Sequence, residues 1–142
     1  MNIAEQILIL IEPFVQEGKI LPRTYHQIDK NIDDFVLIKE SNDIIACAGL
    51  RDLNESDSGE IYCMAVKHRF QKKGQSDVLL KMLIDKARDN NYSKIFALSK
   101  HSSRWFIKNG FSKVGINTLP QQRRGTVDMN RNSSVFLKTI DL

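Results

Sequence analysis

The sequence predicts an α/β fold in which helices flank a central mixed β-sheet. Two strand-like runs, residues 35–39 and 44–50, are separated only by a short polar turn, which is typical of an antiparallel hairpin. Further on, a strand-like run over residues 60–66, an apolar-faced helix over 77–89 and a buried strand over 94–98 follow in the order of a βαβ unit. The two strands of such a unit are parallel and joined by a right-handed crossover. A sheet that contains both kinds of pairing is mixed.

The first 30 residues are expected to form two helices. Apolar residues recur at helical spacing across residues 3–16, although Pro13 inside this pattern predicts a kink or an early end. Gly18 closes the segment. Thr24 and Gln27 have the spacing of a capping box, which predicts a second, short helix that starts at Thr24.

The remaining elements lie in the middle and at the end of the chain. Residues 51–58 are predicted to be a polar loop, and residues 102–109 a helix that Gly110 closes. The last strands are expected over residues 111–114 and 135–138. The loop of about 20 residues between them is long enough to suggest a functional role.

Composition favours one soluble globular domain over residues 1–142. Of the 142 residues, 42% are hydrophobic and 27% are charged, which is ordinary for such a domain. The longest apolar run near the N-terminus, residues 7–11, is too short to span a bilayer, and no signal-peptide pattern surrounds it. We therefore expect a cytoplasmic protein with no membrane partner.

The two cysteines are interpreted as reduced thiols. Cys47 and Cys63 form no CxxC pair, and no histidine stands at metal-ligand spacing, so no metal is expected. The net charge of +4 suits an anionic ligand, and nucleic acid would also respond to it. The aromatic residues, however, look buried and do not interleave with the basic ones, so no nucleic-acid partner is predicted.

A basic loop follows the strand over residues 60–66 and precedes the helix over 77–89. Backbone amides and a helix N-terminus at such a position can hold a phosphate group. Lys72 and Lys73 would meet phosphates by charge, while a solvated basic turn remains an alternative of comparable weight. The loop consists of Gln71, Lys72, Lys73, Gly74, Gln75 and Ser76.

This loop resembles the acetyl-CoA loop of the GNAT superfamily of N-acetyltransferases. That loop has Arg or Gln, two variable residues, Gly, one variable residue, and Gly or Ala; Ser76 departs from the pattern at the last position. Trp105-Phe106 and Asn109-Gly110-Phe111 resemble an aromatic helix and its exit in the same superfamily. The resemblance implies a GNAT-like acyl-CoA N-acyltransferase fold and acetyl-CoA as acetyl donor. Its pyrophosphate would bind the loop amides, and its pantetheine arm would pair with the amides of Met64, Ala65 and Val66.

A narrower resemblance covers nearly the whole chain. Dispersed segments, in the same order, are similar to the acetyltransferase domain of the N-acetylglutamate synthase family. These segments are residues 18–23, 32–35, 59–61 with Cys63, 96–99, 105–106, 119–120 and 131–133. The resemblance implies an amino-acid N-acetyltransferase that acts on the α-amine of L-glutamate, as in arginine biosynthesis. It also implies a catalytic domain without the amino-acid-kinase domain of many family members, and a homodimer is one expected arrangement.

Two residues are candidates for the proton transfers. Acetyl transfer to an amine needs a neutral amine and a protonated leaving thiol. Glu60, at the start of a strand, is placed to take the amine proton directly or through water, and the resemblance implies the same role; a solvated carboxylate is the alternative. Ser99 ends the next strand, and the resemblance implies that it returns a proton to the thiol. A helix N-cap is a second role open to this serine.

Acceptor binding is assigned mainly by the resemblance. A glutamate acceptor carries two carboxylates, which arginine can hold in bidentate geometry. The matching residues are Arg23, Arg131 and Ser133, with backbone groups around Cys63 for the α-carboxylate. Arg123 and Arg124, in the same long loop, are interpreted as solvated surface residues.

Two other functions stay open at this point. One is a GNAT acetyltransferase for another small amine. The other is a catalytically weak CoA-binding regulatory module, for which the serine at position 76 is the one hint.

Overall fold

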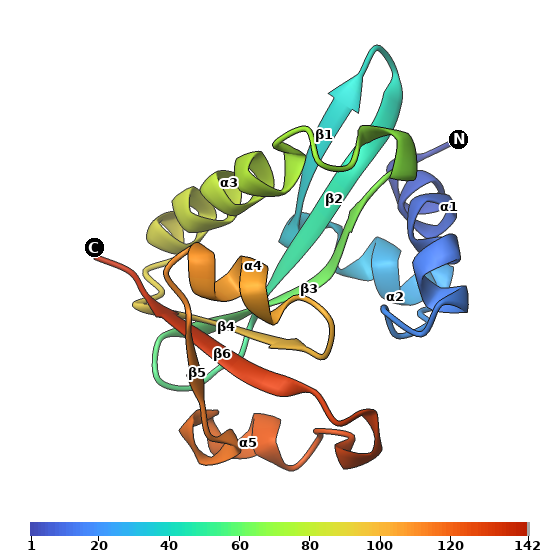
Figure 1. The fold of residues 1–142 in the computed structure, drawn as a ribbon. Coiled ribbons are helices and arrows are strands. Elements are labelled where there is room, and N and C mark those ends of the chain that lie inside the picture. The colour runs from blue at the N-terminus through green and yellow to red at the C-terminus, as the bar shows by residue number, and fades with distance from the viewer. Residues whose placement is uncertain (142) are drawn as a thin grey trace. The chain divides into compact units, whose positions relative to one another are not determined.

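The computed structural model describes residues 1–141 and contains one mixed sheet with helices beside it (Figure 1). The strand order is β1-β2-β3-β4-β6-β5. The strands are β1 Phe35–Glu40, β2 Asp43–Asp52, β3 Ser58–Val66, β4 Lys94–Ser99, β5 Ser112–Val114 and β6 Ser134–Thr139. β1 pairs with β2 antiparallel, β3 with β4 parallel, and β6 antiparallel with both β4 and β5. The predicted hairpin, βαβ unit and mixed sheet are therefore confirmed.

The helices agree closely with the sequence pattern. The longer ones are α1 Ile3–Gln16, α2 Tyr25–Lys30, α3 Gln75–Asp89 and α4 Ser103–Lys108, and α5 Gln121–Arg124 is a single turn. The capping box is present at Thr24, where the Gln27 amide donates to the hydroxyl at 3.1 Å and the Thr24 amide donates to Gln27 Oε1 at 2.9 Å. Pro13 does not end α1, which continues to Gln16.

Backbone contacts divide the chain into two compact units. The first unit consists of Met1–Leu50 and Tyr62–Leu83, and the second of Arg51–Ile61 and the described chain from Ile84 onward. The chain passes from one unit to the other within β2 after Leu50, within β3 after Ile61 and within α3 after Leu83. Each unit has its own buried cluster of apolar side chains, so each is described by itself below.

In the first unit, α1 and α2 bury their apolar faces together with residues of β2 and β3. Ile7 is fully buried, and Ile28 and Ile11 are almost as inaccessible. The cluster consists of Ala4, Ile7, Leu10, Ile11, Phe14, Ile20, Ile28, Ile44, Cys47, Cys63 and Ala65. The i, i+3, i+4, i+7 spacing of Ile7, Leu10, Ile11 and Phe14 is what turns one face of α1 toward this core.

In the second unit, the two faces of the β4–β6 pair are covered by different segments. The ring of Phe106 in α4 stacks on that of Phe136 in β6, with centroids 5.1 Å apart. Phe96, adjacent to Leu137 in the β4–β6 register, instead packs with Leu53, Leu119 and Val135. The segment after β5 therefore supplies a second apolar layer.

Two loop predictions need correction. The segment over 115–134 is not an unstructured loop: it holds the short helices η3 Ile116–Thr118, α5 and η4 Met129–Arg131. Residues 51–58 are loop only in part, because β2 continues to Asp52 and β3 begins at Ser58. In both cases tertiary contacts ordered backbone whose sequence carries no strong periodic signal.

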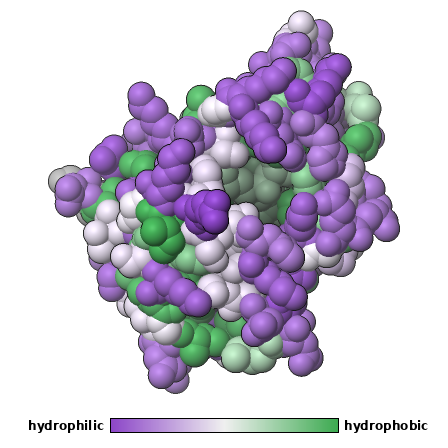
Figure 2. Space-filling model, viewed as in Figure 1, coloured by the Kyte–Doolittle hydropathy of each residue, from purple (hydrophilic) through white to green (hydrophobic). Residues whose placement is uncertain are grey.

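The exposed surface agrees with the composition. Hydrophilic residues dominate the face drawn in Figure 2, and hydrophobic ones are scattered among them in small groups. Across residues 1–141, none of the helices has the length and apolar character needed to cross a membrane.

Candidate active site

The most unusual side chain of the second unit is Glu60, a carboxylate in β3 that is only 3% exposed. Its backbone is fixed by parallel pairing of β3 with β4, in which Glu60 is the partner of Phe96. A buried carboxylate is costly unless cations and hydrogen bonds compensate it. The burial of a charged group at this position therefore points to a functional role for Glu60.

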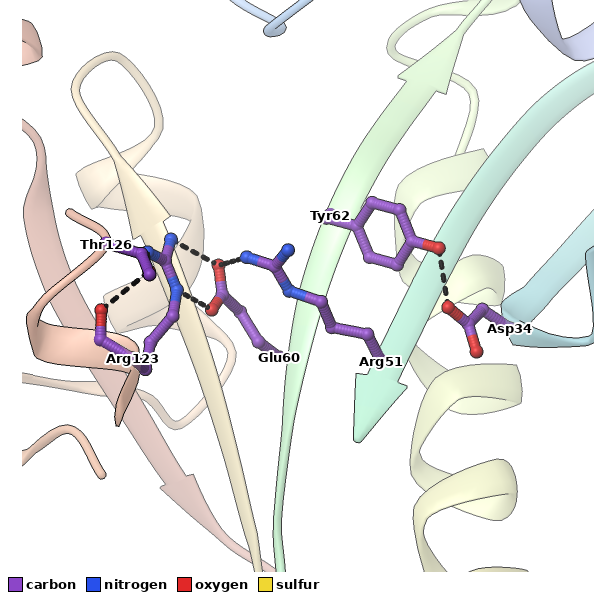
Figure 3. A network of polar contacts seen from close by, with 6 residues as sticks. All are labelled: Asp34, Arg51, Glu60, Tyr62, Arg123 and Thr126. Atoms are coloured by element: carbon purple, nitrogen blue, oxygen red, sulfur yellow. Dashed lines mark hydrogen bonds and ion pairs between the residues drawn. The ribbon is translucent and has the colours of Figure 1, made fainter. Parts of the chain in front are cut away.

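Two arginines supply that compensation (Figure 3). Arg123 of α5 donates from Nε to Oε1 at 2.5 Å and from Nη2 to Oε2 at 3.1 Å. Arg51, near the end of β2, donates from Nη2 to the same Oε2 at 3.2 Å. Oε2 thus accepts two of these bonds and Oε1 one, which leaves Oε1 a lone pair with which to accept a proton.

The interpretation of Arg123 as a solvated surface residue is wrong. Its side chain is 14% exposed, whereas Arg124 beside it is exposed. Arg51 was also missed, because it was assigned to a polar loop. A carboxylate within an otherwise apolar strand is the signal that could have found both arginines, since a buried carboxylate requires a cation nearby.

Ser99 lies on the strand next to Glu60, but not beside it. It is three residues beyond Phe96 on β4, about 10 Å along the strand, and alternation turns its side chain to the opposite face. Its Oγ accepts a hydrogen bond from the Ser102 amide at 3.1 Å, but the N-cap residue of α4 is Ser102, so the alternative role of Ser99 as a helix N-cap is wrong and the bond orders the turn before the helix. The hydroxyl proton can still be donated to another group.

Arg131 and Ser133 lie where the chain enters β6, whose first residue, Ser134, pairs with Ser99. Both side chains are half-buried. The turn between them is shaped by Asp128, which accepts from the Asn130 amide at 3.0 Å, and by Asn132 with φ of 56°. The second unit thus brings Arg131 and Ser133 to the carboxyl end of β4.

A cavity of about 210 Å³ lies beside this turn. Its floor is apolar, from Val114, Ile116, Val127 and Val135, and Ser133 is part of its rim. Glu60 and Arg123 are not among its lining residues.

In the first unit, Arg23 is held over the ring of Tyr62. Its guanidinium carbon is 5.2 Å from the ring centroid, and Nη1 donates to the Leu21 carbonyl at 3.0 Å. The Tyr62 hydroxyl donates to Asp34 Oδ2 at 2.6 Å (Figure 3). Burial, followed by this hydrogen bond, raises the pKa of Tyr62 above its usual value.

Cys63 follows Tyr62 on β3 and has an unusual backbone, with φ of 50° inside a strand. Non-glycine residues in this region are uncommon and interrupt regular strand geometry. Its carbonyl accepts from Cys47 Sγ at 3.3 Å. Burial raises the pKa of the Cys47 thiol, so Cys47 is a neutral core residue. Both cysteines are buried thiols, as expected.

The predicted phosphate loop joins the end of β3 to α3. The Gln71 side-chain amide donates to the Val66 carbonyl at 3.0 Å, which ties the loop to the strand. Lys72 and Gly74 both have positive φ, 62° and 83°. The first helical bond of α3 runs from the Val78 amide to the Gly74 carbonyl at 3.1 Å. The amides that precede Val78 in the first turn therefore point out of the helix N-terminus.

Gln75 and Ser76 are helical and not part of the loop proper, which corrects the predicted helix start at residue 77. Ser76 is not among the residues with positive φ. The backbone at position 76 therefore accommodates a residue with a Cβ. Serine in place of the family's Gly or Ala causes no backbone strain there.

Among residues 1–141, no group of three or more His, Cys, Asp or Glu side chains is arranged to hold a metal ion. The second unit holds a buried carboxylate with two arginines, and a serine and an arginine at the end of β4; the first unit holds a helix N-terminus next to two lysines. These groups can move protons and hold anions.

Comparison with known proteins shows the family to which the chain belongs. The model of the acetyltransferase (GNAT) family matches residues 4–111, and the chain belongs to this family. The amino-acid acetyltransferase of Escherichia coli strain K12 is 34% identical over 131 residues, 92% of this chain and 30% of that protein. The amino-acid acetyltransferase of Pseudomonas putida is 31% identical over 134 residues, 94% of this chain and 31% of that protein.

One solved structure is similar to nearly the whole of this chain. N-acetylglutamate synthase from Neisseria gonorrhoeae, complexed with coenzyme A and N-acetyl-glutamate, has a TM-score of 0.93 and 33% identity. The match covers 97% of this chain and 33% of that one. The chain thus spans about a third of the length of the relatives it matches.

Proposed function

We propose that this protein transfers the acetyl group of acetyl-CoA to the α-amine of an amino acid, with L-glutamate as the acceptor. The observation that carries the proposal is the similarity, across nearly the whole chain, to an N-acetylglutamate synthase solved with coenzyme A and N-acetyl-glutamate. The amino-acid acetyltransferases among the relatives support the same reaction class.

Glu60 is the proposed base. An acceptor ammonium ion loses one proton to become nucleophilic, and Oε1 of Glu60 has the lone pair to take it. The neutral amine then attacks the thioester carbonyl, so that a C–N bond forms and the C–S bond breaks. The burial of Glu60 supports this role because it keeps water from competing for the carboxylate.

Ser99 is the proposed proton donor to the leaving thiolate. After the attack the nitrogen loses a second proton, which replaces the proton that Ser99 gives to the thiolate; free coenzyme A, a neutral amide and a neutral Ser99 hydroxyl result. The support for this role is that the Ser99 Oγ accepts from the Ser102 amide, which leaves the hydroxyl proton available for donation.

Acetyl-CoA is the proposed donor, held by Met64, Ala65 and Val66 along its pantetheine arm and by residues 71–76 at its pyrophosphate. The support is the N-terminus of α3, where Gln75 and Ser76 present amides and Lys72 and Lys73 add positive charge. The bond from Gln71 to Val66 keeps the loop next to the strand.

The acceptor carboxylates are proposed to bind Arg23, Arg131 and Ser133, with help from the backbone around Cys63. The support is that both arginines are half-buried and anchored: Arg23 by the Leu21 carbonyl and the Tyr62 ring, Arg131 by its place in η4. Positioned guanidinium groups lose little entropy when they bind a carboxylate.

A thiol-release assay with acetyl-CoA and each of the twenty amino acids tests the function. We expect release with glutamate to exceed release with glutamine and with the neutral amino acids. No release with glutamate, alongside release with another amine, contradicts the proposal and identifies a different small-amine acetyltransferase. Binding of acetyl-CoA without release to any amine identifies a CoA-binding module.

The variant Glu60→Gln tests the base. We expect turnover to fall by roughly 10²–10⁴-fold, while the Kd for acetyl-CoA, measured by calorimetry, stays near that of the parent. Retained acetyl-CoA binding also shows that the variant is folded. Turnover close to that of the parent contradicts the role of Glu60.

The variants Arg23→Gln and Arg131→Gln test acceptor binding, with the exposed Arg124→Gln as the matched control. We expect the first two to weaken glutamate binding by roughly 2–5 kcal/mol, as for a broken buried charge pair. The control is expected to change KM little. Equal losses for glutamate and for amine acceptors that carry no carboxylate contradict the assignment.

A further inference from the structure

The Arg123 guanidinium holds Glu60 with one of its edges only. Nε and Nη2 donate to the two oxygens of Glu60, and Nη1 donates to Thr126 Oγ1 at 2.8 Å (Figure 3). A guanidinium carries five N–H donors. Within the described chain, Arg123 thus has one N–H on Nη1 and one on Nη2 that these bonds do not use.

Arg123 is also held firmly. The Thr126 hydroxyl accepts from its Nη1 and donates to its carbonyl, both at 2.8 Å. The single turn α5 is fastened at its start, where the Gln122 amide donates to Glu55 Oε2 at 3.0 Å. The Arg123 side chain is ordered by these bonds and is 14% exposed, so part of it remains accessible.

An ordered guanidinium with two unused donors matches a carboxylate, which accepts two parallel N–H bonds. We propose that Arg123 binds a carboxylate of the acceptor amino acid through Nη1 and Nη2 while its other edge holds Glu60. This inference rests on the proposed function, and adds Arg123 to the acceptor-binding residues as the one that joins acceptor and base.

The Arg123 guanidinium, shared by the acceptor and Glu60, explains how an acceptor that carries a carboxylate can bind beside a carboxylate base. Two carboxylates in a buried site repel each other, and the repulsion grows as the dielectric falls. The Arg123 cation between them attracts both carboxylates and so offsets their repulsion. When the group on Arg123 is the α-carboxylate, the amine lies one carbon away from it and is presented near Glu60.

Selectivity follows from the same geometry. An amide in place of the bound carboxylate lacks the negative charge and offers one acceptor oxygen, so the fork of Arg123 loses a partner. Glutamine differs from glutamate only by an amide at the side-chain carboxylate. The α-amide of glutamate differs only by an amide at the α-carboxylate. Whichever amide is disfavoured identifies the carboxylate that Arg123 binds.

The test compares Arg123→Gln with Arg124→Gln, the neighbouring exposed arginine, in acetyl-transfer assays with these three acceptors. We expect Arg123→Gln to raise the KM for glutamate at least about tenfold, and to reduce the preference for glutamate over one of the two amides. The KM for acetyl-CoA and the behaviour of Arg124→Gln should stay close to the parent. Equal loss with all three acceptors overturns the inference, and assigns Arg123 to holding Glu60 alone.

Arg123→Lys provides the second variant, because it keeps the charge beside Glu60 but removes the fork. We expect it to retain most of kcat and to lose acceptor affinity, a split that a purely structural role of Arg123 would not produce. Unchanged KM in Arg123→Lys overturns the inference. Absence of transfer to glutamate by the parent protein contradicts the proposed function itself, so the two failures are distinguishable.

Discussion

The Tyr62 hydroxyl donates a 2.6 Å hydrogen bond to Asp34 Oδ2, across 28 residues of sequence. The same ring lies under the Arg23 guanidinium at 5.2 Å and meets Phe35 edge-on, with centroids 5.3 Å apart. Asp34 therefore orients Tyr62, and Tyr62 orients Arg23. This arrangement gives a proposed acceptor-binding arginine a fixed position within the first unit.

The variant Tyr62→Phe is expected to destabilise the protein by about 1.5–3 kcal/mol, because a hydrogen bond to a charged group is lost. Urea unfolding measures the change. Tyr25→Phe is a matched control, since its hydroxyl accepts an exposed bond from Asn2 Nδ2 at 2.6 Å, and should cost far less. If Tyr62→Phe and Asp34→Asn are fully additive in a double-mutant cycle, the two groups do not interact.

Stability is expected to fall at alkaline pH. Burial raises the pKa of Cys47 and of Tyr62 above their ordinary values of 9.0 and 10.0. The folded state therefore holds these protons more tightly than the unfolded state, so their contribution is fully present below about pH 9 and is lost progressively as the pH rises. Urea unfolding at a series of pH values measures the loss.

The double variant Cys47→Ala, Tyr62→Phe is the control for this pH dependence. It is less stable at neutral pH, but its stability should fall less steeply above pH 9, because both thiol and phenol are gone. A parent and a double variant with parallel alkaline profiles contradict the assignment of the effect to these two groups.

The variant Gly74→Ala is expected to weaken acetyl-CoA binding. Gly74 has φ of 83°, and a Cβ added there would meet no heavy atom within 4 Å, so the cost is one of backbone conformation, about 1–2 kcal/mol. Gly18→Ala is the matched control, with φ of 74° and equally open surroundings. Both variants should lose similar stability in urea, and only Gly74→Ala should raise the Kd for acetyl-CoA. An equal Kd in both contradicts the role of the loop.

The variant Ser99→Ala is expected to lower kcat and leave the KM for glutamate nearly unchanged, because the proposed role concerns the leaving thiol. It also removes the acceptor of the Ser102 amide, at a cost of about 1 kcal/mol. Ser102→Ala is the control: Ser102 is the N-cap residue of α4, and its side chain makes no capping bond. Similar kcat values for the two variants contradict a catalytic role for Ser99.

The sequence alone determined the elements whose signals are local. The capping box at Thr24, the hairpin turn between β1 and β2 and the apolar stripe of α1 each depend on side chains within a few residues of one another. Such patterns act before the chain is compact, so they predict structure without knowledge of the fold. The dispersed resemblance to a family extended this to the GNAT-like fold and to the choice of Glu60 as a candidate base.

Only the tertiary structure decided the partners of Glu60. Arg51 is 9 residues away in sequence and Arg123 is 63 residues away, and nothing in the local pattern separates Arg123 from the solvated Arg124. The difference arises because α5 is held against the loop before β3, which turns one arginine toward a buried carboxylate and the other toward water. Burial of a charge is a property of the assembled fold, and its compensation can be located only once distant segments have met.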